Sequence, residues 1–555
     1  MARKRQCKTW AVIDIETARS GHVLAIGLCY RENDRTVYQQ LDHWGELLRQ
    51  IEQRQINRVY AHNGGGFDYL SMLQYLPDDW KIDGSVNNGK LIAVTINRGD
   101  YQCRFVDSFR IAPVSLNSLA GSLLGAAKTE NAAEYHPEDM LAVEPERFAA
   151  YLRSDCELLL GCIEKMTDIY RKISPKFSSL GITCGSTAMK LWDSMEHPRY
   201  DRPLSAKLNQ VLKLAYTGGR CECLRPGDYA GVTSYDVNSM YPFAMTKAAV
   251  PLSGRVLLTD KFRGRPGVWL VDFHQSRGHV PLFMVQGNGQ FSGRGWYYSP
   301  EISAALEFGI AVKIIAGFEF LDYTDGLFRD FIEPLWDLRV KYGSQSAFGL
   351  VSKLSMNNLY GKMGQGDAIE SIFSATDSDT ILSRNASVLD LSRDLYSGVE
   401  SKLCEHQHYG IAGTITSYSR AYLFRLMAGN NPIYCDTDSI HTLEKMPDIP
   451  GLGGLKIEKQ ARRAIYAGKK MYGMQLTDSG EIIRIKGVKV GNKEIQWRIT
   501  IPEMATLLKG KAIPATFQSF PTMREVLADR AQSCRLITRT RTVRMLERER
   551  AKLRR

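Results

Sequence analysis

Along about the first 170 residues, the hydrophobic and polar positions form strand-like patterns that alternate with helix-like ones, which predicts an α/β domain. Residues 11–15, 23–30 and 91–96 are short, mainly apolar runs of strand length, rich in Val, Ile and Leu. Residues 147–160 repeat apolar positions with the spacing of an amphipathic helix. A helical stretch follows and ends near Tyr216, because the glycine pair at 218 and 219 disfavours a helix.

The rest of the chain alternates between strand patterns and helical patterns. Strands are expected from Tyr229 to about Phe320, helices from Gly326 to Met363, and strands again from Gly410 to Val490. Residues 367–408 are polar and rich in Ser and Asp, which is typical of an inserted subdomain or a long loop. The residues after 490 are predicted to be helical and become basic towards the end.

Composition narrows the class of protein without identifying it. A chain of 555 residues with 44% hydrophobic and 24% charged residues is expected to form several globular domains. Its net charge of +12 favours a polyanionic partner, either nucleic acid or an anionic membrane surface. No apolar run is long enough to cross a membrane, and the basic start leads into a strand pattern instead of a signal peptide. Because the 11 cysteines are scattered, we expect reduced thiols in an intracellular protein.

Two carboxylates, Asp436 and Asp438, follow an apolar run at 431–434 that predicts a buried strand. If the strand continued through both residues, its two-residue period would point both side chains to the same side. Like charges so close are costly unless a cation neutralises them, and hard oxygen ligands favour Mg²⁺. A solvated hairpin turn is the alternative, and this motif alone does not exclude it.

A second group of acidic residues lies in the first domain. Asp14 and Glu16 end the first strand, Asp68 follows a glycine-rich loop, and Tyr151 and Asp155 share one helical face. Each pattern alone also fits a strand-end turn, a glycine-rich loop or a solvated helix face. Together, four carboxylates and a phenol suit two metal ions about 4 Å apart, with the tyrosine hydroxyl able to orient an attacking water.

In content and order, these segments resemble the three exonuclease motifs of proofreading DNA polymerases with an RNase H-like fold. The resemblance implies that the four carboxylates bind metal and that Tyr151 orients the water. It also implies that several residues bind frayed single-stranded primer. For Phe67, an ordinary place in the hydrophobic core is an equally good explanation. The residues implied in these contacts are Thr17, Asn63, Phe67, Ser115 and Leu116, with Lys128 as a loosely aligned basic residue.

Two further segments carry polar residues at positions that chemistry could use. Asp236 is predicted at a strand end, before a turn that Pro242 stops, where it could simply cap a helix. Lys353, Asn357 and Tyr360 share one stripe of a predicted helix, which on an isolated helix would be a solvated face.

These two segments and the Asp436–Asp438 pair resemble, in order, motifs A, B and C of family B DNA polymerases. The resemblance implies two Mg²⁺ ions, replaceable by Mn²⁺, on Asp236, Asp438 and the Val237 carbonyl, with Asp436 as a supporting neighbour. It implies in-line attack of a primer 3′-hydroxyl on the α-phosphate of a deoxynucleoside triphosphate. The residues implied to bind that nucleotide are Val237, Tyr241, Lys341, Lys353, Asn357 and Tyr360, with Tyr241 excluding a 2′-hydroxyl. Gly349 stands where many relatives carry another basic residue.

Other motifs resemble the protein-primed branch of that family, which occurs in phages and linear plasmids. They include Asp-x-Asn-Ser at 236–239 and Tyr-x-Gly-Gly at 216–219. The residues that this resemblance implies in DNA binding are Tyr216, Gly218, Gly219, Thr416, Arg420, Lys470 and Tyr472. Residues 317–332 resemble the first insertion of that branch, and 367–408 leave room for the second, a strand-displacement collar.

The resemblance therefore implies a multidomain α/β and α+β protein in which an exonuclease domain precedes a right-hand polymerase domain. The exonuclease domain would span 1–190 and the polymerase domain 191–555. Within the latter, the palm would cover about 191–325 and 411–490, the fingers about 330–365, the insertion about 366–410 and the thumb about 491–555.

We expect a monomeric replicative enzyme, located in the cytoplasm of a host cell. Its expected partners are template-primer DNA, deoxynucleoside triphosphates and a terminal (priming) protein. An RNA-primed, DNA-primed or primer-independent polymerase could share every catalytic motif. A stand-alone Mg²⁺-dependent exonuclease explains only the first domain, and a non-catalytic DNA-binding module would show no metal-dependent turnover.

The end of the chain is strongly basic. The residues concerned are Arg535, Arg539, Arg541, Arg544, Arg548, Arg550, Lys552, Arg554 and Arg555. We interpret them as a thumb edge that follows duplex phosphates, with a solvated or frayed helix as the alternative.

Overall fold

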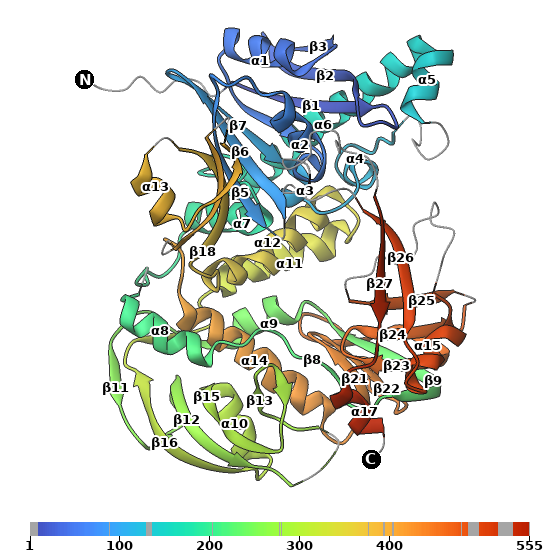
Figure 1. The fold of residues 1–555 in the computed structure, drawn as a ribbon. Coiled ribbons are helices and arrows are strands. Elements are labelled where there is room, and N and C mark those ends of the chain that lie inside the picture. Colours follow the sequence, from blue (N-terminus) through green and yellow to red (C-terminus); the bar gives the residue numbers. More distant parts are fainter. Residues whose placement is uncertain are drawn as a thin grey trace.

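The computed structural model describes residues 9–553 except 88, 129–135, 203, 277, 279, 376, 392–393, 402–403, 479, 487–498, 520–524 and 526–536. Within these residues, no helix has the length and apolar character needed to cross a membrane. Figure 1 shows a large sheet at the top and another at the lower right, with the helices α11 (Arg329–Tyr342) and α12 (Ala347–Met363) between them. Both helices fall inside the region predicted to be helical.

In the described residues the upper sheet has ten strands, and the sixth to eighth of them run parallel. In spatial order they are β19 (Ser387–Asp390), β20 (Leu395–Ser401), β18 (Ala368–Ser374), β5 (Lys81–Asn87), β6 (Lys90–Arg98), β7 (Tyr101–Asp107), β4 (Ile56–Ala61), β1 (Thr9–Thr17), β2 (Val23–Glu32) and β3 (Arg35–Leu41).

Helices cover both faces of this sheet, which explains the continuous apolar run of β1. Val12 lies in one core with the long helix α6 (Pro145–Ile173), whereas Ala11 and Ile13 lie in another with α1 (Trp44–Gln53) and α2 (Asp68–Tyr75). A strand buried on both faces needs apolar residues at every position. The remaining helices here are α3 (Ser108–Ile111), α4 (Leu116–Leu124), α5 (Pro137–Val143) and the short 3₁₀ turn η1 (Gly64–Gly66).

The Ser- and Asp-rich segment after 367 completes the upper sheet. Strand β18 pairs antiparallel with β5, and Ile372 is buried in the same core as Ile82 and Val86. The Ile82 amide donates to the Ser374 hydroxyl at 3.1 Å. The described residues of this segment, predicted as an inserted subdomain or a long loop, therefore add three strands to a sheet formed far earlier in the chain, together with the short helix α13 (Ser378–Ser383).

The lower sheet has seven strands, and all of its neighbours pair antiparallel. In order they are β25 (Glu481–Ile485), β24 (Met471–Leu476), β23 (Leu455–Gly468), β9 (Gly227–Val237), β22 (Ser439–Thr442), β21 (Pro432–Asp436) and β8 (Cys221–Cys223). Helices α10 (Ser299–Glu307) and α14 (Tyr409–Met427) share a core with β9 and β21, and so cover one face.

Helix α14 contradicts the prediction that strands resume at Gly410. Most of its side chains are buried, so its sequence has no polar stripe and the run of apolar and β-branched residues resembles a buried strand. Strand structure resumes only at Pro432.

The prediction of a wholly helical end to the chain is also wrong. Among the described residues there, β26 (Ile513–Ser519) and β27 (Ile537–Val543) form an antiparallel ribbon beside α15 (Ile501–Leu508), and α17 (Glu547–Leu553) follows. The Thr and Arg residues of β27 alternate with a period of two, which suits a strand with β-branched residues on one side.

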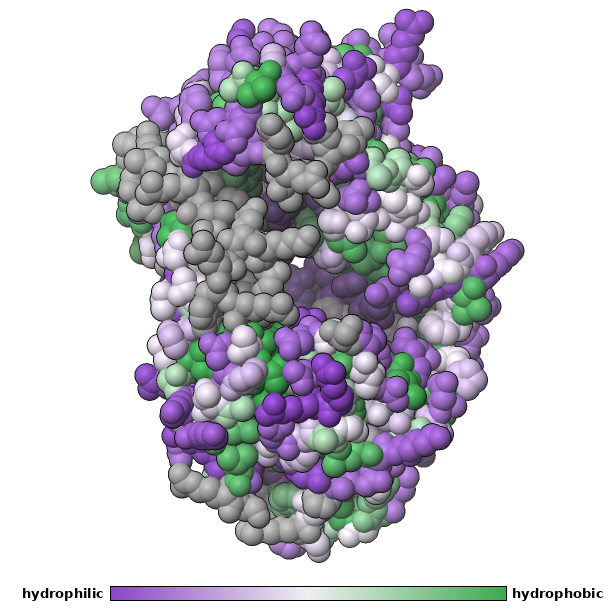
Figure 2. Space-filling model, turned by 90° about the vertical axis from the view of Figure 1, so that its right-hand side faces the viewer, coloured by the Kyte–Doolittle hydropathy of each residue, from purple (hydrophilic) through white to green (hydrophobic). Residues whose placement is uncertain are grey.

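Smaller elements complete the fold. A four-stranded sheet has the order β11 (Val256–Leu258), β16 (Ala311–Phe320), β12 (Gly267–His274) and β15 (Ser292–Tyr298). The short pairs are β10 (Ala249–Pro251) with β17 (Tyr323–Asp325), and β13 (Met284–Val285) with β14 (Asn288–Gly289). The remaining helices are α7 (Cys184–Ser194), α8 (Ala206–Ala215) and α9 (Met240–Lys247). Figure 2 shows that one face is hollowed at mid-height, between the upper and lower parts of the molecule.

Candidate functional site: two separate groups of carboxylates

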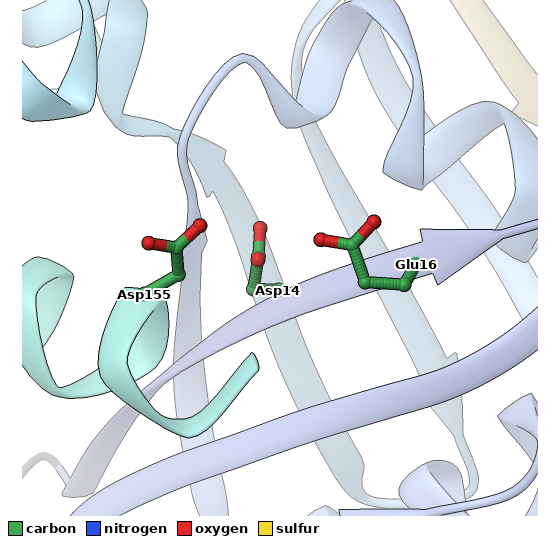
Figure 3. Close-up of side chains that lie close together, drawn as sticks. All are labelled: Asp14, Glu16 and Asp155. Atoms are coloured by element: carbon green, nitrogen blue, oxygen red, sulfur yellow. The ribbon is translucent and has the colours of Figure 1, made fainter. Parts of the chain in front are cut away.

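The first group of carboxylates lies where β1 meets helix α6. Asp14 and Glu16 project from β1 and Asp155 from α6, and one oxygen of each lies within 4.8 Å of the others (Figure 3). Burial, followed by the neighbouring Asp155 charge, raises the pKa of Asp14 to about 7. Burial and the Asp14 charge raise the pKa of Glu16 well above its ordinary value. Closely spaced carboxylates at a depth that disfavours their charge suit a divalent cation.

Asp68 interacts electrostatically with the same group. It begins α2, directly after η1, and is only 5% exposed. A Cβ on Gly65 would collide with the Leu91 carbonyl, so only glycine allows the turn to approach β6 this closely. Burial and the Asp14 charge raise the pKa of Asp68.

Two further side chains complete this region. Tyr151 is buried one helical turn before Asp155. Lys128 forms an ion pair with Asp155, and its ammonium lies 5.6 Å from the centre of the Tyr151 ring. The loosely aligned Lys128 therefore lies directly at the carboxylates, where its charge opposes the effect of burial on the pKa of Asp155.

The residues predicted to bind single-stranded primer differ in how far they are exposed. Thr17 ends β1, and Asn63 precedes η1 with a left-handed φ of 65°. Phe67 is half-buried and packs against the core of the upper sheet. Ser115 caps α4 by accepting from the Ser118 amide at 3.2 Å, while Leu116 is buried in the core.

The second group lies at the hairpin between β21 and β22. The expectation of two aspartates on one strand is wrong, because β21 ends at Asp436 and Thr437 takes a left-handed φ of 63°. The Asp438 amide donates to the Asp436 carbonyl at 2.7 Å, so both aspartates lie in a tight turn. The alternative of a hairpin turn describes the geometry correctly, but Asp438 is half-buried instead of fully solvated.

Sheet register brings Asp236 to this turn from a distant part of the sequence. Strands β9 and β22 pair with Asp236 opposite Ser439, and the Val237 amide donates to the Asp438 carbonyl at 2.8 Å. Burial, followed by the Asp236 charge, raises the pKa of Asp438 to about 6.

Two lysines partly compensate the acidic charges of this second group. Lys456 lies 3.8 Å from Asp236, and Lys470 lies 3.4 Å from Asp436. Burial nevertheless raises the pKa of Asp236, although the Lys456 charge acts against it.

A cavity of about 360 Å³ joins the three segments predicted as motifs A, B and C. Its lining combines acidic residues of the sheet with cationic residues of α11 and α12, which suits a metal-bound polyphosphate. The lining residues are Asp236, Asn238, Ser239, Met240, Tyr241, Trp336, Arg339, Val340, Ser344, Lys353, Asn357, Asp438 and Lys456. Tyr360 lies behind Tyr241, stacked on it with ring centres 4.3 Å apart.

Arg339 lines this cavity in place of the predicted Lys341. Lys341 is exposed, and its ammonium lies 5.3 Å from the centre of the Tyr342 ring. Residues two apart on a helix point to different sides, so α11 can present only one of these two cations. Arg339 is half-buried, and burial lowers its pKa. Its spacing from Trp336, three residues, places both on the same helical face, but the sequence alone does not show which face of α11 lines the cavity.

Two residues predicted to bind DNA are buried. Thr416 is 1% and Arg420 is 4% exposed. The Thr416 hydroxyl donates to the Gly413 carbonyl at 3.1 Å, and Arg420 pairs with Glu301 inside the core. Neither side chain has surface available to DNA, so this prediction is corrected to a role inside the protein.

The other residues predicted to bind DNA are less deeply buried than Arg420 or lie beside open space. Tyr216 packs against Tyr409, and no atom would lie within 4 Å of a Cβ on Gly218. Tyr472 packs with Tyr434 and Tyr466 in an aromatic cluster next to Lys470. These placements leave their predicted roles as predictions.

The basic end of the chain partly binds the protein itself. Lys552 donates to the Glu222 carboxylate at 3.3 Å and to the Cys223 carbonyl at 2.7 Å, and Arg550 donates to the Gly510 carbonyl at 2.8 Å. Arg539 pairs with Glu525. Arg541, Arg544 and Arg548 are exposed, and Arg535, Arg554 and Arg555 lie outside the described residues. Because the cationic groups of Lys552 and Arg550 bond to the protein itself, these two residues do not belong to an edge that follows duplex phosphates in this arrangement.

The family model described as "DNA polymerase type B, organellar and viral" matches residues 127–259 and 286–447. A "DNA-directed DNA polymerase" of Enterobacteria phage PRD1 is 27% identical over 480 residues, 82% of this chain and 81% of the relative. A "Probable DNA polymerase" of Neurospora intermedia is 26% identical over 520 residues, 78% of this chain but only 53% of the relative, so the chain spans about half the length of that protein.

Solved structures match over nearly the whole fold. Phi29 DNA polymerase in complex with primer-template DNA and incoming nucleotide covers 97% of this chain, with a TM-score of 0.72 and 18% identity. The orthorhombic form of the same protein gives a TM-score of 0.71. At this level of identity the match establishes the fold.

The placement of Arg339 makes a prediction about nucleotide affinity. Arg339→Ala should weaken binding of a deoxynucleoside triphosphate in the presence of Mg²⁺ by about tenfold or more, because a charge-assisted contact to phosphate is lost. Lys341→Ala is the matched control on the same helix and should change the dissociation constant less than about twofold. Titration calorimetry measures both, and a larger effect for Lys341→Ala would contradict the assignment.

Proposed function

Because the chain belongs to the organellar and viral type B DNA polymerases, we propose that it is a DNA-directed DNA polymerase that edits its product with a 3′–5′ exonuclease. One observation carries this proposal. Asp236, Asp438 and Lys353 come from three distant segments and meet in one cavity, while a second carboxylate group around Asp14 lies in the other sheet.

In the proposed polymerisation site, the chain's own residues position the nucleotide and balance its charge. Asp236, Asp438 and the Val237 carbonyl would hold divalent metal ions, Mg²⁺ or the substituting Mn²⁺. When bound, such ions neutralise phosphate charge and make a hydroxyl a better nucleophile. Arg339 and Lys353 line the same cavity as these aspartates and would bind the triphosphate oxygens. The reaction then joins the primer 3′-oxygen to the α-phosphorus and releases pyrophosphate.

Tyr241 is proposed to select the sugar. Its ring lines the cavity and is backed by Tyr360, so it cannot retreat from a ribose 2′-hydroxyl without disturbing the stack. Exclusion by a clash is a general route to specificity.

In the proposed exonuclease site, Asp14, Glu16, Asp68 and Asp155 would hold the metal ions and Tyr151 would orient a water towards the terminal phosphodiester. The raised pKa values of these carboxylates support this assignment, since metal sites are built from groups that are costly to ionise without the cation. Lys128 would be displaced from Asp155 as the metal ions bind.

We extend the proposal to the organisation of the chain. Residues 1–190 would form the exonuclease domain, with strands β18–β20 added to its sheet from the insertion at about 366–410. Residues 191–555 would form the palm, fingers and thumb. Template-primer DNA would lie in the hollow between the two parts (Figure 2), and the enzyme would act as a monomer in the cytoplasm of a host cell.

Two rival functions make different predictions. A stand-alone exonuclease would give no role to Asp236, Lys353 and Asp438, and the cavity that joins them would be incidental. A non-catalytic DNA-binding module would explain neither carboxylate group.

The two groups of carboxylates should be separable by mutation. Asp438→Ala should reduce primer extension by about 100-fold or more, because a metal ligand is lost, and should leave degradation of single-stranded DNA unchanged. Asp14→Ala should do the reverse. Extension of a labelled primer and shortening of a labelled oligonucleotide measure both activities in the same preparations. Normal nucleotide incorporation by Asp438→Ala would show that the polymerisation site has been placed wrongly.

Initiation is a separate part of the proposal. The resemblance to the protein-primed branch leads us to propose that a terminal protein supplies the first hydroxyl and that synthesis displaces the second strand. Incubation with one radiolabelled nucleotide and the neighbouring gene products should give label that stays on a protein through denaturing electrophoresis. Label in a free oligonucleotide would instead favour RNA-primed or primer-independent synthesis.

A further inference from the structure

A buried ion pair joins α10 to α14 in the core of the lower part of the molecule. The Arg420 guanidinium donates to both oxygens of Glu301, at 3.0 Å and 2.6 Å, and the Ser417 hydroxyl donates to the second oxygen at 2.9 Å. The two side chains of the ion pair are only 3% and 1% exposed. Such a pair is costly to bury unless its geometry is good, and this two-pronged arrangement meets that condition.

The same guanidinium also holds a segment of backbone. Its remaining terminal nitrogen donates to the carbonyls of Thr217 and Gly218, the latter at 3.0 Å. Glu301 fixes the plane of the guanidinium, and the guanidinium in turn fixes residues 217–220, the segment between α8 and β8. All three nitrogens of the Arg420 guanidinium therefore donate hydrogen bonds to acceptors within the protein.

Residues 217–220 contact two features of the polymerisation site, the Tyr241 side chain and the turn that carries Asp438. A Cβ on Gly219 would lie 2.5 Å from the Tyr241 hydroxyl and 2.9 Å from the Thr437 methyl group, so backbone and side chains are in close contact there. The Thr437 amide donates to the Arg220 carbonyl at 2.6 Å. Thr437 is the left-handed residue between Asp436 and Asp438, and a β-branched residue keeps that conformation only when its surroundings impose it.

We propose that Glu301 and Arg420 are positioning residues of the polymerisation site. The ion pair holds residues 217–220 against the sugar-selecting tyrosine and against the turn that carries Asp438. The proposal rests on the proposed function and deepens it, because it assigns sugar selection and metal-ligand geometry partly to residues that touch neither nucleotide nor metal.

Glu301→Gln tests the proposal with the smallest change in shape. It keeps one acceptor oxygen but removes the charge that orients Arg420. The preference for deoxyribonucleotides over ribonucleotides should fall by roughly tenfold or more and the KM for deoxynucleotides should rise, since small displacements at a site have large kinetic effects. Degradation of single-stranded DNA at the Asp14 site should be unchanged, which also shows that the variant is folded.

The neighbouring pair of Glu307 and Arg425 provides a matched control. It joins the same two helices at the surface, with the Arg425 Nε 2.7 Å from the Glu307 carboxylate. Glu307→Gln should leave sugar preference, KM and nuclease activity at their original values, because exposed ion pairs contribute little.

A second variant approaches the same contact from the other side. Gly219→Ala keeps the ion pair but places a methyl group against Tyr241 and Thr437, and it should reproduce the loss of sugar preference. Original sugar preference and KM in Glu301→Gln, or parallel loss of polymerase and nuclease activities, would overturn the proposal. If the unmodified protein extended no primer at all, the proposed function would fail instead, so the two failures are distinguishable.

Discussion

The pairing of β9 with β22 is the constraint on which the polymerisation site depends. It sets Asp236 opposite Ser439 and joins the Val237 amide to the Asp438 carbonyl, although the two strands are about 200 residues apart in the chain. A slip of one residue would turn every side chain of one strand to the other face. Tyr235, Val237 and Ile440 are buried in one core, so the hydrophobic contacts that stabilise the sheet also fix the separation of the two aspartates.

Both carboxylate groups concentrate negative charge at partly buried positions. The pKa of Asp14 rises to about 7 and that of Asp438 to about 6, in each case chiefly because of burial. Nearby lysines, Lys128 in one group and Lys456 in the other, relieve only part of this cost. The arrangement is therefore poor for the stability of the protein alone and well suited to binding divalent cations, a compromise that is expected at functional sites.

Much of this site was predictable from the sequence, because motif spacing specifies which residue types lie at strand ends and on helix faces. Asp14, Glu16, Asp236 and Lys353 occupy such positions. The exchange of Lys341 for Arg339 was not apparent, since the direction in which α11 presents its cations depends on how the helix packs. The burial of Arg420 was missed for a related reason. Its partner Glu301 is 119 residues away, and no local pattern indicates that pairing.

The secondary structure of larger segments was predicted incorrectly where the local sequence pattern and the tertiary packing favour different structures. Helix α14 has no polar stripe because it is buried on all sides, and its apolar run was interpreted as strand. The polar segment after 367 resembled a loop, yet β18 finds its hydrogen-bond partners on β5. Sheet extension by a distant segment depends on which edge is free in the folded molecule, and that is a property of the whole chain.

Anomalous diffraction from crystals grown with Mn²⁺, primer-template DNA and a non-hydrolysable deoxynucleotide tests the central claim most directly. The account predicts metal peaks between Asp236 and Asp438 in the cavity beside Lys353, with the triphosphate next to Arg339. Absence of metal between these two aspartates, or a nucleotide bound elsewhere in the molecule, would contradict it.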